Sequence, residues 1–331
     1  MADLVIGIAT SHSPLLSTPP EQWDLRANAD RENRRLYFRG RAYDFETLVW
    51  ARAPGFGNQT FLDVRQERYW RCQRALDTLR AKLIEIAPDA VVIVGNDQRE
   101  IFSDSLTPAI TVYRGSEIEN IPFTDKEPSP GLAIAEHGNC PAGGAVYPGC
   151  PEFADHIIES LIGNDFDVAE SSSLPRSVLR PGVPHAFGFV YHRLLGDTPP
   201  PSVPIIFNVH YPPNRPLLRR CLAFGHALRR AIRSWDGARR VALIASGGLS
   251  HFVIDEALDA RVLSAMETGN EDVLARMPEE LFCAGTAEIK NWLPVVAAMN
   301  EEHRRFHKVD YVPCYRSEAG TGNAMGFVYW E

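Results

Sequence analysis

The chain has 331 residues, of which 45% are hydrophobic and 23% are charged, and its formal net charge is −8. These values are ordinary for a folded globular protein, and the length allows one large domain or two small ones with an ample core. The negative charge argues against nucleic acid or an anionic membrane surface as the main partner.

No apolar run in the chain approaches the length of a membrane span. The first residues, MADLVIGIATSHSP, lack the charged region and the cleavage site of a signal peptide. The six cysteines show no C-x-x-C spacing, which favours reduced thiols over disulfides or structural zinc. We therefore expect a cytoplasmic protein.

Short apolar runs and amphipathic helical patterns alternate along the chain. The runs that have the length and composition of buried strands are Leu4–Ala9, Ala90–Val94, Ala109–Tyr113, Val203–Val209, Val241–Ala245 and Gly326–Trp330. Helical patterns occupy residues 67–87, 151–164 and 217–235, and the first of them places Trp70, Ala75, Leu79 and Leu83 on one side. The alternation predicts an α/β fold with a mixed or parallel central sheet flanked by helices.

Two segments fall outside this alternation. Residues 18–66 are rich in arginine and aromatic residues. The aromatic residues are too many for a solvated tail, so we expect an inserted helical cap or a subunit contact. Residues 125–150 are rich in proline and glycine and are typical of a long surface loop or a lid. Neither segment looks like a separate domain, so we expect residues 1–331 to form a single catalytic domain.

Four of the ten histidines stand at predicted strand ends or in adjoining loops. One histidine after a strand is more often a loop residue that is hydrogen-bonded to the backbone than a catalyst. Four at comparable positions favour a shared site, because open α/β sheets bind ligands beyond the carboxyl ends of their strands. The four stretches are ATSHSP (His12), GVPHAFG (His185), FNVHYPP (His210) and SGGLSHF (His251).

Further polar residues could join this site. The strand at 90–94 runs directly into Gly95-Asn96-Asp97-Gln98, and Gly247-Gly248 lets the backbone before His251 approach a ligand closely. Glu288 lies near the start of a predicted helix, where a carboxylate more often complements the helix dipole than binds a ligand. No G-x-S-x-G elbow and no glycine-rich nucleotide loop is present in the sequence.

Together these stretches resemble the type II extradiol ring-cleaving dioxygenases, the family of the protocatechuate 4,5-dioxygenase β subunit. They fall in the family's order and span nearly the whole chain, and STPPEQW and VIVGNDQ are most similar to the single-chain 3-O-methylgallate dioxygenase branch. The matching stretches are TSHSP, VGNDQ, GVPHAFG, FNVHYPP, SGGLSH, AGTAEIKNWL and GTGNAMGFVYW.

The resemblance implies a non-haem Fe(II) enzyme that opens a catecholic ring beside its two hydroxyls, using O2. His12 and Glu288 match two of the family's metal ligands, which leave open positions for both substrate oxygens and O2. His251 matches the acid/base histidine, and His185 matches a second active-site histidine. His210 is not matched and could contact the substrate or the metal.

The chain departs from the family at Gln98, where the second metal-binding histidine usually stands. Glutamine can bind a metal through its carbonyl oxygen, as a weaker ligand, and Asp97 or His210 could take its place. One alternative is therefore a catalytically silent homologue that binds a ligand or a partner subunit, and another is a metal-dependent hydrolase on the same scaffold. The presence of His12, Glu288, His251 and His185 argues against the silent alternative, because a silent homologue has no chemical need for all four.

The expected substrate is a catecholic aromatic acid such as gallate, 3-O-methylgallate or protocatechuate. The arginines of residues 18–66 suit such an acid because guanidinium groups pair with carboxylates, although a solvated cap face is the alternative. We also expect a homodimer that binds neither nucleic acid nor a membrane.

Overall fold

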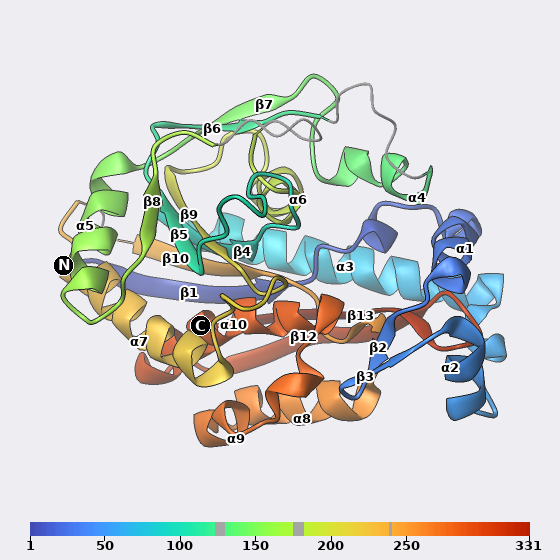
Figure 1. Cartoon of the computed structure of the whole chain (residues 1–331). Coiled ribbons are helices and arrows are strands. Elements are labelled where there is room, and N and C mark those ends of the chain that lie inside the picture. The colour runs from blue at the N-terminus through green and yellow to red at the C-terminus, as the bar shows by residue number, and fades with distance from the viewer. Residues whose placement is uncertain (123–129, 175–181, 238–239) are drawn as a thin grey trace.

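The structure is a computed structural model that describes residues 1–122, 130–174, 182–237 and 240–331. The described residues form a nine-stranded sheet in the order β11-β13-β1-β10-β4-β9-β5-β8, with β12 paired to β13 (Figure 1). This mixed sheet, flanked by helices, confirms the predicted α/β fold. Its strands are β1 (Asp3–Thr10), β4 (Ala90–Asn96), β5 (Ile110–Tyr113), β8 (Ala169–Ser171), β9 (Ser202–Phe207), β10 (Arg240–Ser246), β11 (His251–Val253), β12 (Phe306–Tyr315) and β13 (Thr321–Trp330).

Four parallel strands form the centre of the sheet. β1 pairs with β10, β10 with β4 and β4 with β9, so that all four carboxyl ends lie at one edge. β13 runs antiparallel to β1, and β5 runs antiparallel to β9, on either side of this centre. The polar segments that follow the four central strands therefore meet at the same edge.

Helices cover both faces of the sheet. Along β4, Ala90, Val92 and Val94 belong to one buried cluster and Val91 and Ile93 to the other, as the two-residue period of a strand requires. The first cluster includes residues of α5 (Pro151–Ile162), α7 (Leu218–Ser234) and α10 (Ile289–Glu301). The second includes residues of α3 (Leu62–Ile86) and α6 (His185–Phe189). Strands buried on both faces explain the nearly continuous apolar runs of the sequence.

The prediction of the apolar face of α3 is wrong for one residue. Ala75, Leu79 and Leu83 are buried as predicted, but the side chain of Trp70 is 59% exposed. Ala75 is five positions after Trp70, and five steps of a helix rotate the side chain by about 140°. Cys72, which lies one turn before Ala75, occupies the buried stripe instead.

The prediction of a continuous loop at 125–150 is also wrong for the part that the structure describes. Residues 125–129 lie outside the described residues, but α4 (Pro130–Ala133) follows them directly. β7 (Ala145–Pro148) then pairs with β6 (Glu117–Asn120) in a small separate sheet. The role of this region as a lid stays a prediction.

Residues 18–66 contain strands as well as helices. They form α1 (Asp24–Glu32), β2 (Leu36–Phe38), β3 (Arg41–Tyr43) and α2 (Phe45–Ala51), which lie together near β13 in Figure 1. Leu36 and Leu48 pack with Val253 and Ala319 in a small buried cluster. Of the aromatic residues expected to be covered, Trp23 is buried, but Trp50 is 86% exposed. Whether the segment acts as a cap or as a subunit contact stays a prediction.

Two further observations bear on the sequence-based expectations. All six cysteines are free thiols. Among the residues that the structure describes, no helix is both long and apolar enough to cross a membrane.

A buried ion pair ties α1 to the segment between β12 and β13. The carboxylate of Asp30 accepts hydrogen bonds from Nε and Nη2 of Arg316 at 2.5 and 2.7 Å, and from the hydroxyl of Thr321 at 2.5 Å. A nearby exposed pair joins Arg31 to Glu318 at 2.9 Å. The two pairs differ mainly in burial, which decides how much each carboxylate contributes to stability.

We expect Asp30→Ala to lower the free energy of unfolding by about 3–5 kcal/mol, because it leaves the buried Arg316 guanidinium without its counter-ion. Glu318→Ala is the matched control and should lower it by no more than about 1 kcal/mol, because that pair is exposed to water. Urea unfolding curves of both variants measure the difference. Equal losses would contradict the importance of the buried pair.

Candidate active site

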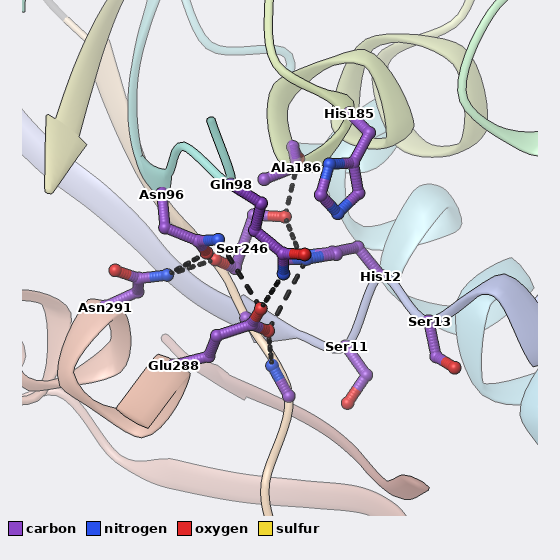
Figure 2. Close-up of polar contacts among 12 residues, drawn as sticks. Ser11, His12, Ser13, Asn96, Gln98, His185, Ala186, Ser246, Glu288 and Asn291 are labelled. Atoms are coloured by element: carbon purple, nitrogen blue, oxygen red, sulfur yellow. Dashed lines mark hydrogen bonds and ion pairs between the residues drawn. The ribbon is translucent and has the colours of Figure 1, made fainter. Parts of the chain in front are cut away.

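The structure brings the six predicted site residues together at the carboxyl edge of the sheet. His12 follows β1, Gln98 follows β4, His210 follows β9, and His251 begins β11 after the turn that ends β10. Figure 2 shows His12, Asn96 and Gln98 pointing toward Glu288, with His185 beside His12. The rings of His12 and His185 meet edge to face with their centroids 4.9 Å apart.

Glu288 is at the centre of the group. It ends the 3-10 turn Ala284–Glu288, immediately before α10, and its side chain is 2% exposed. Its Oε2 accepts a hydrogen bond from the backbone N–H of Gly248 at 2.9 Å, and its Oε1 accepts one from Nε2 of Gln98 at 2.9 Å. Burial raises the pKa of this carboxyl, but the positive charge that His12 and His251 carry when protonated outweighs burial and holds the pKa well below its usual range.

The hydrogen bonds of Ser246 define the tautomer of His12. The Ser246 hydroxyl donates to the carbonyl oxygen of Ala186 at 2.6 Å, so it must accept the N–H of His12 Nδ1 at 3.0 Å. In a neutral His12 the lone pair is then on Nε2, which lies 3.4 Å from Oε2 of Glu288. Lone pairs that face each other repel, so a cation between these two atoms would stabilise them.

The cation between His12 and Glu288 can be a proton or a metal ion. Burial lowers the pKa of His12 from its ordinary value, although Glu288 opposes the shift, and this disfavours the proton. The imidazoles of His12, His210 and His251 each place Nε2 within 3.5 Å of a carboxylate oxygen of Glu288. The donors therefore fit a metal cation in their chemistry.

Histidine and carboxylate side chains do not complete a metal site by themselves. Within the part of the chain that the structure describes, no group of three or more histidine, cysteine, aspartate or glutamate side chains could hold a metal ion. A metal at His12 and Glu288 thus needs a donor of another kind, and the amide of Gln98 lies beside the carboxylate. In the structure the nitrogen of that amide faces Glu288, whereas metal binding by Gln98 would use its oxygen.

His251 approaches the Glu288 carboxylate from the end of the loop that follows β10. Its Nδ1 donates to the carbonyl oxygen of Leu249 at 2.7 Å, which leaves Nε2 directed to Oε2 of Glu288 at 3.5 Å. The loop behind it is held by Asp259, whose carboxylate accepts hydrogen bonds from the N–H and the hydroxyl of Ser250 at 2.8 and 2.6 Å. The hydroxyl of Tyr311 donates to the same carboxylate at 2.8 Å.

His185 is oriented by a carboxylate that the sequence analysis missed. Its Nδ1 donates to Oε1 of Glu100 at 2.6 Å, and its backbone N–H donates to Oε2 at 2.8 Å. The second ring nitrogen, Nε2, is on the other side of the imidazole from Glu100, and His185 lines the cavity. Glu100 stands only two residues after Gln98, but nothing in the sequence indicates which histidine it contacts.

Asp97 and His210 were alternatives for completing the metal site, and each has other partners. The Asp97 carboxylate accepts backbone N–H groups of residues 99–102, so it organises its own loop. Asn291 donates from Nδ2 to the backbone oxygen of Ser246 and to Oδ1 of Asn96. The Nδ2 of Asn96 must therefore donate to Nε2 of His210 at 3.2 Å, which engages the lone pair of that nitrogen.

A cavity of about 390 Å³ opens in front of these side chains. His12, Gln98, His185, His251 and Glu288 line it, whereas His210 does not. Its other charged and polar lining residues include Arg26, Arg99, Arg316, Asn139 and Asn323. A cavity of this size lies within the usual range of small-molecule sites.

Comparison with known proteins gives an independent indication of function. Residues 62–325 match the protein family described as the catalytic LigB subunit of aromatic ring-opening dioxygenase. The chain is 28% identical to a gallate dioxygenase of Pseudomonas putida over 193 residues, and this aligned region covers 54% of each protein. It is 29% identical over 180 residues to a 2,3-dihydroxyphenylpropionate/2,3-dihydroxicinnamic acid 1,2-dioxygenase of Comamonas testosteroni, covering 54% of this chain and 48% of that protein. The chain thus spans about half the length of these curated relatives.

The support of His251 by Asp259 generates a pH-dependent prediction. Burial raises the pKa of Asp259 to about 6, although the hydrogen bonds from Ser250 oppose the shift. An unfolded aspartate titrates near pH 3.9, so the stabilising contribution of the protonated folded form is lost as the pH rises to about 6. The asparagine side chain of Asp259→Asn does not titrate, so this variant lacks that pH-dependent loss. Between about pH 4.5 and about pH 7.5, the unfolding free energy of Asp259→Asn minus that of the unmodified protein should therefore rise by about 2 kcal/mol, as measured by urea unfolding.

Any loss of stability that Asp259→Asn causes equally at every pH does not affect this test, which concerns only the change with pH. A difference between the two proteins that stays constant across the pH range would contradict the raised pKa.

Proposed function

Because the chain belongs to the family of catalytic LigB subunits of aromatic ring-opening dioxygenases, we propose that it is an extradiol dioxygenase that opens a catecholic aromatic acid with O2. The observation that carries the proposal is the convergence of His12, His251 and Gln98 on the buried Glu288 carboxylate at the wall of a cavity. The relatives are named for gallate and 2,3-dihydroxyphenylpropionate, which are both aromatic acids. A gallate, 3-O-methylgallate or protocatechuate-like substrate is consistent with these names.

We propose that His12 and Glu288 hold Fe(II), with the amide oxygen of Gln98 as the third protein donor. This arrangement requires the amide of Gln98 to turn, so that Oε1 replaces Nε2 beside the carboxylate. When bound, Fe(II) would offer positions for the two substrate oxygens and O2 and would lower the pKa of the substrate hydroxyls. Ser246 would support this site by keeping the His12 proton on Nδ1.

His251 is the proposed acid/base residue. Its Nδ1–H is engaged with the Leu249 carbonyl, so Nε2 is the atom that would accept a proton from a substrate hydroxyl and return it later. His185 would bind a developing negative charge through its Nε2, because Glu100 holds the other nitrogen. His210 would act indirectly, since its Nε2 is engaged with Asn96 and it does not line the cavity.

We further infer from the sequence that residues 1–331 act as a single catalytic domain that assembles as a homodimer in the cytoplasm. The relation to the 3-O-methylgallate dioxygenase branch likewise rests on the sequence resemblance alone.

The metal site is tested by three proteins titrated anaerobically with Fe(II). Glu288→Ala should lose specific binding because it removes the central anionic ligand. Gln98→His should bind at least about tenfold more tightly than the unmodified protein, because a neutral amide oxygen is a poorer donor than imidazole. Bound iron is measured after removal of free metal.

Gln66→His is the matched control, because Gln66 is exposed on α3 and a histidine there should leave the affinity unchanged. Full iron binding by Glu288→Ala would refute the site. Absence of specific binding in the unmodified protein would favour the catalytically silent homologue.

Ring cleavage is tested by O2 uptake of the Fe(II)-loaded protein with gallate, 3-O-methylgallate, protocatechuate and catechol. His251→Phe should keep its iron but turn over about 10²–10⁴ times more slowly, because positioned proton transfer is lost. His307→Phe is the control, since the ring of His307 on β12 stacks on Tyr329 of β13 and does not line the cavity. No O2 uptake with any of the four compounds would refute the proposed function, and normal turnover of His251→Phe would refute the role of His251.

A further inference from the structure

Among the described residues that line the cavity, Arg26 is a cation without a hydrogen-bonded counter-ion. Arg26 of α1 lines the cavity that holds His12 and Glu288. Its Nε is buried and has no hydrogen-bond partner, and its guanidinium forms no ion pair with a described residue. An unpaired buried polar group is rare in a folded protein and calls for an explanation.

The other two arginines of the cavity already have partners. Arg316 binds Asp30 through Nε and Nη2 and donates from Nη1 to Asn323 at 2.9 Å. Arg99 pairs with Asp104 at 2.5 Å and lies over the ring of Tyr211 at 4.0 Å. Neither guanidinium needs a ligand to satisfy it, so Arg26 is distinct among the three.

The charges around Arg26 do not cancel. Asp30 is the carboxylate that stabilises its charged form, but both oxygens of Asp30 are engaged by Arg316, and one of them also by Thr321. Burial and the neighbouring Arg316 lower the pKa of Arg26 to about 10, which still leaves it charged near neutral pH. Two guanidinium groups thus share one carboxylate, and the corner of the cavity has an excess positive charge.

The stem of Arg26 is held in place by α4. A Cβ atom at Gly131 would lie 2.6 Å from Cδ and 3.0 Å from Cγ of Arg26, so only a glycine leaves room for this side chain. Leu132 and Ala135, which follow Gly131, line the same cavity and offer an apolar surface to an aromatic ring. The charged group therefore has a defined position beside an apolar wall.

We propose that Arg26 binds a carboxylate on the ring of the aromatic substrate, so that the cavity selects aromatic acids over neutral catechols. The inference rests on the proposed function and adds the residue that would set its substrate class. A planar guanidinium can bind a carboxylate through two parallel hydrogen bonds, which also orients the ring. The ligand's carboxylate would then be held at Arg26, and its hydroxyls would face Glu288 and His251.

Anaerobic calorimetry with the Fe(II)-loaded protein tests this role without turnover. Protocatechuate and catechol are the two ligands, because they differ only in the carboxylate. Arg26→Met should weaken the binding of protocatechuate about 10- to 100-fold, which is the usual effect of losing one hydrogen-bonded charge pair. The affinity for catechol should change by no more than about twofold. Arg26→Lys keeps the charge and should show a smaller loss.

Arg34→Met is the control, because Arg34 is an exposed arginine of the same segment, and it should bind both ligands as the unmodified protein does. Unchanged catechol binding also shows that Arg26→Met is folded. Equal weakening of both ligands, unchanged protocatechuate binding, or no binding of protocatechuate to the unmodified protein would overturn the role of Arg26.

The O2-uptake assay separates this inference from the proposed function. Suppose that the unmodified protein consumes no O2, while Arg26→Met binds protocatechuate more weakly and catechol normally. The ring-cleaving function then fails and the anion site stands. If the unmodified protein cleaves the ring and Arg26→Met keeps the same KM for protocatechuate, the function stands and the anion site fails.

Discussion

The buried carboxylate of Glu288 is the constraint on which the site depends. A carboxylate that is 2% exposed is stable only where donors or cations replace water. Those groups come from the loops after β1, β4, β9 and β10, because the four strands are parallel and end at the same edge. The pairing of the central strands therefore decides which side chains can reach Glu288.

Near this carboxylate, each of the three histidines that line the cavity has its Nδ1 engaged by an oxygen of the protein. Ser246 engages Nδ1 of His12, Leu249 engages Nδ1 of His251, and Glu100 engages Nδ1 of His185. The Nε2 atoms of His12 and His251 are directed to Oε2 of Glu288, at 3.4 and 3.5 Å. Arg26 adds positive charge to the same cavity, so that acidic and basic groups line the space that a ligand would fill.

Much of the fold could be predicted because local periodicity reports burial. The run at 90–94 lies within β4, and the helices at 151–164 and 217–235 closely match α5 and α7. Trp70 was placed on the wrong face because an aromatic residue looks apolar wherever it stands in a helix. β12 was missed because its mixture of charged and apolar residues reflects a strand that is only partly buried.

The local sequence pattern was enough to place His12, Gln98 and the turn before His251 after strands, and Glu288 before a helix. What each of these residues contacts depends on how distant segments of the chain pack against one another. Asn96 and Asn291 are 195 positions apart, yet their hydrogen bond directs the amide of Asn96 to His210. Arg26 resembles its neighbouring arginines in the sequence and is distinguished only because Arg316 engages Asp30. Strand and helix patterns are local, whereas hydrogen-bond partners and counter-ions depend on packing between distant segments.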